Sequence, residues 1–153
     1  MVESAKLRKK MAAMRTEVHE ALVRSVEANA EKVCAEMRAM LAIQRPAVAA
    51  QVDIEWTWGD GPKGSFTIGK ASFNGAETTA LTVTIYARAK SGSGISAGWF
   101  EFGTAPRFHK SGKTTGRITA TPFFFPVYRS NRQRVQSSLR AALRRAVKKI
   151  NAS

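Results

Sequence analysis

Apolar residues in the first third of the chain recur every three or four positions, which is the spacing of one helical face. The stripe consists of Leu7, Met11, Met14, Val18, Leu22, Val26, Ala30, Val33, Met37 and Leu41. Such a stripe predicts one long helix over residues 5–45. Pro46 should end it, because proline cannot continue the helix and disfavours helical angles at the residue before it.

The expected helix is long for the size of the chain. About 38 residues at ~1.5 Å each would extend roughly 57 Å. A compact domain built from a chain of this length measures only ~40 Å across. We therefore expect the helix either to kink near residues 28–30 or to extend beyond its domain and pack on another subunit.

Between residues 52 and 102 the hydrophobic pattern changes from a helical period to the two-residue period of a half-buried strand. Residues 52–58 and 81–87 alternate apolar and polar side chains and predict two strands. Residues 65–71 predict a third, joined to the first as a hairpin by the glycine-rich turn at 59–64. A fourth, short strand is expected at residues 99–102. No connection here is long enough for a helical crossover, so the sheet should be mainly antiparallel.

Two aromatic clusters, at residues 99–102 and 123–125, enclose a polar stretch that contains glycine and cannot form a core. We expect the clusters to meet while residues 103–121 project as a loop. Pro126, followed by Ser130 or Asn131, carries the start signals of a final helix over residues 127–150. Its expected buried stripe is Val135, Leu139, Leu143, Val147 and Ile150.

These elements predict one α+β domain over residues 1–153. It would have a long N-terminal helix, a small sheet of about four strands, and a C-terminal helix packed on the sheet. The single cysteine, Cys34, excludes an intramolecular disulfide and should be a small apolar residue of the first helix. No apolar run has the ~20 residues of a membrane helix. The acidic residues near the basic N-terminus argue against a transit peptide, so we expect synthesis in the cytosol.

Charge is distributed very unevenly in this chain, which has a net charge of +14. Residues 1–101 contain 13 basic and 11 acidic residues, whereas residues 102–153 contain 12 basic residues and no acidic one. A one-signed segment of that length indicates an acidic partner, which could be a nucleic acid or an acidic protein surface. A solvated basic face without a partner is the simpler alternative.

Few residues in the sequence are candidates for catalysis. His19 is expected on the surface of the first helix, and His109 in the projecting loop, with no spacing typical of a metal site. Glu101 lies among aromatic residues, where a carboxylate could have a raised pKa and act as an acid. It could equally pair with an arginine of the last helix or accept backbone N–H groups of the loop that follows it. The structural roles are favoured because no second catalytic group is evident.

Two short motifs resemble a family of bacteriophage proteins. They are Trp99-Phe100-Glu101-Phe102-Gly103-Thr104 and Thr121-Pro122-Phe123-Phe124-Phe125-Pro126, separated by a polar loop and followed by a basic helix. The whole layout is similar to the tail-component family of long-tailed phages and related gene transfer agents, which supplies tail-completion or head-to-tail joining proteins. In that family the second motif usually continues through leucine and arginine, where this chain has Phe124 and Phe125. The family's closing helix also mixes acidic with basic residues.

The resemblance implies a structural virion protein of the phage neck or tail, without catalysis or cofactors. Such a protein forms a ring, expected to be six-fold, that completes the tail and joins it to the capsid connector. Its partners would be connector or stopper and tail tube proteins, with DNA passing through the lumen without sequence-specific binding. The expected structural residues are Trp99, Glu101, Phe102, Gly103, Pro122, Phe123, Phe124 and Pro126. The expected partner-binding residues are Arg107, His109, Lys110, Lys113, Arg117, Arg140, Arg144 and Lys148.

The main alternative is a basic nucleic-acid-binding module, since the sequence pI is about 10.8. Against it, the aromatic residues cluster in core-like runs and are not spaced among basic residues as a stacking platform would be. A small hydrolase or nuclease is a third alternative, which rests on Glu101 and His109 alone.

Overall fold

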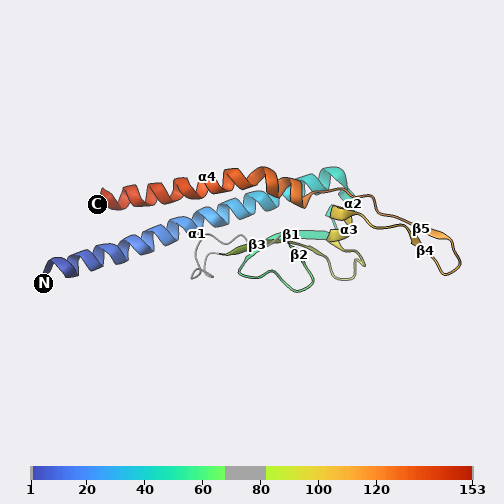
Figure 1. Cartoon of the computed structure of the whole chain (residues 1–153), viewed down its shortest axis with the longest axis horizontal. Helices are drawn as coiled ribbons and strands as arrows, with labels where there is room; N and C mark the ends of the chain where they lie inside the picture. Colours follow the sequence, from blue (N-terminus) through green and yellow to red (C-terminus); the bar gives the residue numbers. More distant parts are fainter. Residues whose placement is uncertain (1, 68–81, 153) are drawn as a thin grey trace. The chain divides into compact units, whose positions relative to one another are not determined.

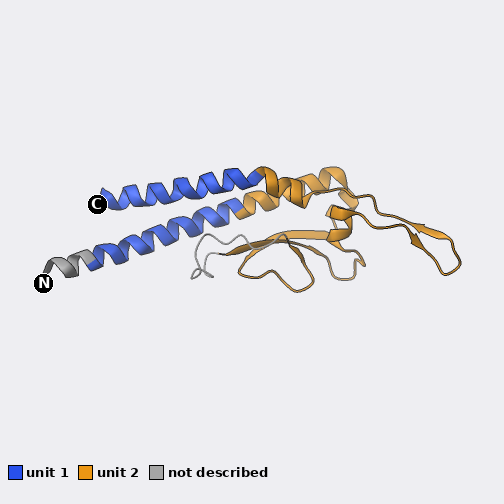
Figure 2. Ribbon diagram, in the orientation of Figure 1, with its two compact units in different colours: residues 1–29, 131–153 blue, residues 30–130 orange. Residues whose placement is uncertain are grey.

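The computed structural model describes residues 2–67 and 82–152, with side chains from residue 8 onward. The chain divides into two compact units (Figure 2): one combines Met1–Asn29 with Asn131–Ser153, and the other is Ala30–Ser130. The elements, in chain order, are α1 (Val2–Gln44), α2 (Pro46–Ala49), β1 (Val52–Trp58), β2 (Phe66–Thr67), β3 (Val83–Ala89), α3 (Ala97–Phe102), β4 (Arg107–Phe108), β5 (Thr114–Gly116) and α4 (Phe124–Asn151).

The predicted N-terminal helix is confirmed, as is its end before Pro46. Arg45 leaves the helical region with a φ of −147°. Pro46 begins the short helix α2, and proline is tolerated at this position because a backbone N–H there would have no partner within the helix. Between Leu22 and Leu41 the expected apolar stripe is buried except at Val26, which is half-buried, and Val33 and Met37 lie in the core. Met11, by contrast, is 63% exposed. The side chain of Leu7 lies outside the described residues.

In the first unit, the N-terminal part of α1 and most of α4 lie side by side (Figures 1 and 2). The amide of Asn29 donates to the carbonyl of Ser25 over 2.6 Å and to the hydroxyl of Ser138 over 3.0 Å. Lys149 forms an ion pair with Glu17 near the other end of the pair. Polar contacts therefore join the two helices at both ends of their contact.

In the second unit, three antiparallel strands form a sheet in the order β1-β3-β2. The strand predicted at 52–58 is confirmed, and it pairs with β3 from Val52 opposite Ala89 to Trp58 opposite Val83. The predicted hairpin between the first two strands is wrong, because β2 pairs with β3 instead. Of the strand expected at 65–71, residues 68–71 lie outside the described residues, as does residue 81 of the strand expected at 81–87.

The central position of β3 follows from the path of the turn after β1. The hydroxyl of Thr84 donates to the carbonyl of Gly59, so the turn lies over one face of β3. A Cβ at Gly61 would lie 3.1 Å from the side chain of Thr67 and 3.3 Å from that of Thr84. Glycine permits this close approach, and the chain reaches the far edge of β3 before β2 begins.

The strand expected at residues 99–102 is wrong, since these residues belong to the helix α3. Ser96 is still extended, with a φ of −125°, and Gly103 ends the helix with a φ of +76°. Consecutive Phe100 and Glu101 are both buried, whereas Phe102 is 63% exposed. Neighbours in a strand point to opposite faces, so this burial fits a helix. A short apolar run does not distinguish a helix from a strand by its pattern.

Residues 103–121, predicted to project as a loop, contain a two-stranded antiparallel ribbon of β4 and β5 that extends from the second unit (Figure 1). At its tip, the N–H of His109 donates to the carbonyl of Lys113 over 2.7 Å. At its base, the N–H of Thr104 donates to the carbonyl of Ile118 over 2.9 Å. We call residues 103–121 the basic hairpin.

The final helix begins earlier than predicted, at Phe124 and not after Pro126. Neither Ser130 nor Asn131 caps it, since both lie inside the helix. Pro126 is in the first turn, where the backbone N–H groups have no partner within the helix, so proline is tolerated there. The start of α4 packs on the sheet, with the ring of Phe124 at 5.3 Å from that of Phe66 in β2.

Candidate functional site

Glu101 joins the motifs at residues 99–104 and 121–126 by capping the start of α4. Its Oε2 accepts the N–H groups of Phe123 and Phe124, and its Oε1 accepts the N–H of Phe125, each over 2.9 Å. The side chain is buried, with 3% of the residue exposed. Backbone N–H groups at a helix start are left without intrahelical partners and carry partial positive charge, so a carboxylate is well suited to them.

This geometry decides between the alternatives for Glu101. Both carboxylate oxygens accept backbone N–H groups at the start of α4, which is a structural role. The donors are the N–H groups of residues 123–125, and neither the expected loop after Glu101 nor an arginine of the last helix supplies them. The arrangement therefore fixes the base of the basic hairpin, because α3 precedes the hairpin and α4 follows it.

An aromatic cluster surrounds this contact. The ring of Phe66 lies 5.5 Å from that of Phe102 and 6.3 Å from that of Phe125, and the rings of Phe102 and Phe125 are 5.8 Å apart. Phe123 and Phe124 are fully buried, whereas Phe125 is half-buried. The two aromatic clusters meet as predicted, through Phe102 and Phe125, but the contribution of Phe66 is not among the expectations. Its place in the cluster depends on the sheet order, which local patterns do not reveal.

The remaining structural residues define the turns between the motifs. Gly103 is required at its position, because a Cβ there would lie 2.9 Å from the carbonyl oxygen of Ile118, and its φ is +76°. Pro122 and Pro126 are exposed. Trp99 is partly exposed and lies beneath the guanidinium of Arg107, 5.0 Å from the ring centroid. Trp99 thus holds the first basic side chain of the hairpin.

The expected partner-binding residues fall into two sets. Five of them are exposed on the basic hairpin: Arg107, His109, Lys110, Lys113 and Arg117. The Nδ1 atom of His109 lies 3.3 Å from the hydroxyl of Ser111, which makes this histidine a loop contact. Phe108 lies among the basic residues and is 68% exposed. Sequence reasoning overlooked Phe108, although its separation from both aromatic clusters was a usable signal.

The second set, Arg140, Arg144 and Lys148, lies on α4 in the first unit. Their spacing of four residues places them along one helical face, and all three are exposed. Neighbouring Arg145 and Lys149 line a shallow groove of about 380 Å³ together with Glu17 and Arg24. The α4 face is therefore basic, and its groove also contains acidic Glu17, which pairs with Lys149.

Histidine, cysteine and carboxylate side chains do not gather into a metal site within residues 2–67 and 82–152. His19 is exposed on α1, as expected. Cys34 is fully buried on the same helix, and burial raises the pKa of its thiol from 9.0 to about 12. A thiol with that pKa is a poor nucleophile at neutral pH.

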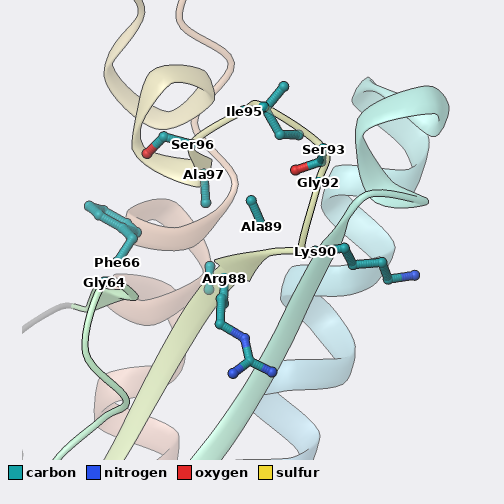
Figure 3. Close-up of a pocket in the computed structure, with 12 residues that line it drawn as sticks. Gly64, Phe66, Arg88, Ala89, Lys90, Gly92, Ser93, Ile95, Ser96 and Ala97 are labelled. Atoms are coloured by element: carbon teal, nitrogen blue, oxygen red, sulfur yellow. The ribbon is translucent and has the colours of Figure 1, made fainter.

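A hollow of about 300 Å³ lies between the end of β3 and the loop before α3 (Figure 3). The hydroxyl of Ser93 is buried there and has no hydrogen-bond partner among the described residues. The side chains of Arg88 and Lys90 point away from the hollow (Figure 3), and the ammonium of Lys90 instead donates to the carbonyl of Ala50 over 2.9 Å. The hollow therefore contains a hydroxyl group but no converging charge.

No protein-family model, no curated protein and no solved structure matches this chain. None of the helices among the described residues is long and apolar enough to span a membrane.

Proposed function

We propose that this protein is a structural component of the neck or tail of a bacteriophage virion. It forms a ring that completes the tail and joins it to the capsid connector. The proposal rests on the two motifs at residues 99–104 and 121–126 and on the contact between them. Glu101 of the first motif binds the backbone of the second, so both motifs serve one structural purpose, which is to hold the basic hairpin by its base.

The exposed surface of the basic hairpin is the feature that most directly supports binding to another protein. It combines an exposed phenylalanine, Phe108, with five exposed basic or histidine side chains and has no acidic residue. A structure that projects both apolar and charged groups from a fixed base is suited to binding another protein. Interfaces gain affinity from buried apolar area and specificity from complementary charge. The proposed partners are connector or stopper and tail tube proteins, and the proposed location is the virion.

Deletion of the gene from the genome that encodes it tests the proposal. The expected result, by electron microscopy of the lysate, is DNA-filled capsids and tails that are not joined. Supplying the wild-type chain should restore complete particles, whereas a chain with residues 105–117 replaced by a glycine-serine linker should not. Complete, infectious particles in the absence of the protein would overturn the proposal.

A nucleic-acid-binding module is the second candidate, and one observation favours it. The segment from residue 102 to 153 contains 12 basic residues and no acidic one, and basic side chains on the hairpin and on α4 are exposed. DNA moving through a neck must slide past the lumen, so tight phosphate contacts would oppose that function. Direct measurement of DNA affinity against salt distinguishes the two candidates.

A further inference from the structure

β1 is an edge strand of the three-stranded sheet. β1 pairs with β3 on one side, and within the described part of the chain no strand pairs with the other side. At this edge the Nε of Arg38 donates to the carbonyl of Ile54 over 2.8 Å, so a side chain of α1 takes up a backbone group that a strand would otherwise use. A seven-residue edge of this kind is a surface on which another chain can dock.

A groove of about 470 Å³ runs along this edge between α1 and β1. Its apolar part is formed by Leu41, Ala42, Ala49, Val52 and Ile54, and its polar part by Arg38, Asp53 and Glu55. Asp53 is 3.8 Å from the ammonium of Lys90, and Glu55 accepts a hydrogen bond from the hydroxyl of Tyr86 over 2.7 Å. The groove thus presents an apolar floor beside two carboxylates and the guanidinium of Arg38. Leu41, Val52 and Ile54 are buried within this floor, and Ala42 and Ala49 are its accessible apolar side chains.

The basic hairpin has the complementary features. Phe108 supplies an exposed aromatic side chain that the apolar floor could bury. Lys110 and Lys113 flank it and are exposed. The hairpin has no acidic residue, whereas two carboxylates, Asp53 and Glu55, line the groove. Phe108 and the hairpin lysines are exposed within one copy, so they are accessible to another molecule.

We propose that the basic hairpin of one copy docks into the β1 groove of a second copy, with Phe108 on the apolar floor and the hairpin lysines beside Asp53 and Glu55. The inference rests on the proposed ring-forming function and names the surfaces that close the ring. The two surfaces differ, so the contact between copies is heterologous: the hairpin of each copy binds the groove of the next. Heterologous contacts generate a closed ring when the rotation from one copy to the next divides a full turn evenly. The α4 residues Arg140, Arg144 and Lys148 then remain available for the partner proteins of the neck.

Charge exchange between two variants of the full chain tests the pairing. Lys110→Glu with Lys113→Glu makes the hairpin acidic, and Asp53→Lys with Glu55→Lys makes the groove basic. Each variant alone should associate at least about tenfold more weakly than wild type, because like charges then face each other. An equimolar mixture should recover association, since each hairpin then meets a groove of opposite charge. Light scattering after size exclusion measures the association.

Matched controls separate this contact from a general loss of charge or apolar area. Arg144→Glu with Lys148→Glu makes the same change on α4 and should leave association unchanged. Phe108→Ala should weaken association at least about tenfold, whereas Phe108→Leu should retain most of it. A wild-type chain that stays monomeric at every concentration would overturn the inference. So would a mixture of the charge variants that associates no better than its components.

A cysteine pair provides a second, geometric readout. Thr114 is paired with Phe108 in the hairpin, and Ala42 is exposed beside the groove. Mixing Thr114→Cys and Ala42→Cys chains under oxidation should give a cross-linked dimer, which Thr114→Cys with Ala28→Cys should not. Cys34 is buried and should not take part. Equal cross-linking in both mixtures, or none in the first while wild type is associated, would contradict the inference.

The tests also distinguish failure of this inference from failure of the proposed function. If the charge variants still join heads to tails in the deletion background, the hairpin contact is not required for the ring and only this inference fails. If particles are complete without the protein, the proposed function fails, whatever the association measurements show.

Discussion

The carboxylate of Glu101 in α3 accepts the backbone N–H of Phe124, the first residue of α4, over 2.9 Å. The residues are far apart in sequence, and between them lies the whole basic hairpin. A helix start normally takes its cap from a residue next to it in sequence. Here the cap comes from another helix. The Glu101 side chain therefore both satisfies the N–H groups at the start of α4 and fixes the base of the hairpin.

Glu101→Ala should therefore destabilise the protein strongly. Three N–H groups lose their carboxylate acceptor in a buried site, and we expect the free energy of unfolding to fall by about 4 kcal/mol. Glu101→Gln keeps one carbonyl acceptor and should lose about half of that. Urea unfolding followed by circular dichroism measures both variants. Wild-type stability in Glu101→Ala would contradict the capping role.

The aromatic cluster should show a graded response to truncation. Phe124 is 1% exposed, so Phe124→Ala removes a buried ring and should lower the free energy of unfolding by about 3–5 kcal/mol. Phe125→Ala should cost less, because that ring is half-buried. Phe108→Ala should leave stability unchanged and serves as the control. Thermal unfolding of the three variants checks this order, and equal melting temperatures would disprove it.

The sequence predicted much of the fold because long periodic segments carry a strong signal. The stripe from Leu22 to Leu41 predicted the buried part of α1, and alternation predicted β1. The structural role of Glu101 was also among the expected alternatives. Its backbone donors were expected in the following loop, and that expectation is wrong. The actual contact depends on α3 being a helix, and the four residues that suggested a strand are too few to reveal a helical period.

Other features could not be predicted because they depend on distant contacts. The start of α4 was placed too late, since Ser130 and Asn131 resemble a local cap while the actual cap is Glu101. The sheet order was misjudged because a hairpin is the simplest connection between neighbouring strands. The close approach at Gly61 lets the turn lie over β3 on its way to the other edge, and local sequence patterns do not reveal such a contact.

The buried thiol of Cys34 should make stability depend on alkaline pH. Burial raises its pKa in the folded protein from 9.0 to about 12. In the unfolded chain the thiol ionises near pH 9, whereas in the folded protein it stays neutral. Its contribution to stability is therefore complete below pH 9 and is lost as the pH rises from there towards 12, by up to about 1.4 kcal/mol per pH unit.

Cys34→Ala provides the comparison that isolates this effect. Urea unfolding at several pH values between 8 and 11 should show a steeper decline for wild type than for the variant. The native thiol should also react slowly with a disulfide reagent at pH 8 and rapidly once the protein is unfolded. Identical pH dependence in the two proteins would mean that Cys34 does not titrate as its burial requires.

The last prediction concerns the affinity of the free protein for duplex DNA, which should be weak at physiological salt. If the basic segment bound DNA directly, each neutralised phosphate would contribute about −0.9 to the slope of log affinity against log salt. Six contacts among the basic residues of 102–153 would then reduce the affinity by about three orders of magnitude between ~50 and ~200 mM salt. Pairing of Arg140, Arg144 and Lys148 with an acidic protein instead adds specificity to an interface whose affinity comes from buried apolar area. Assembly should then survive moderate salt, while DNA binding does not.

Titration of the purified chain on a random duplex decides between the structural neck protein and the nucleic-acid-binding module. Sub-micromolar binding at ~150 mM salt that is abolished by reversing the three α4 charges would favour the nucleic-acid-binding module.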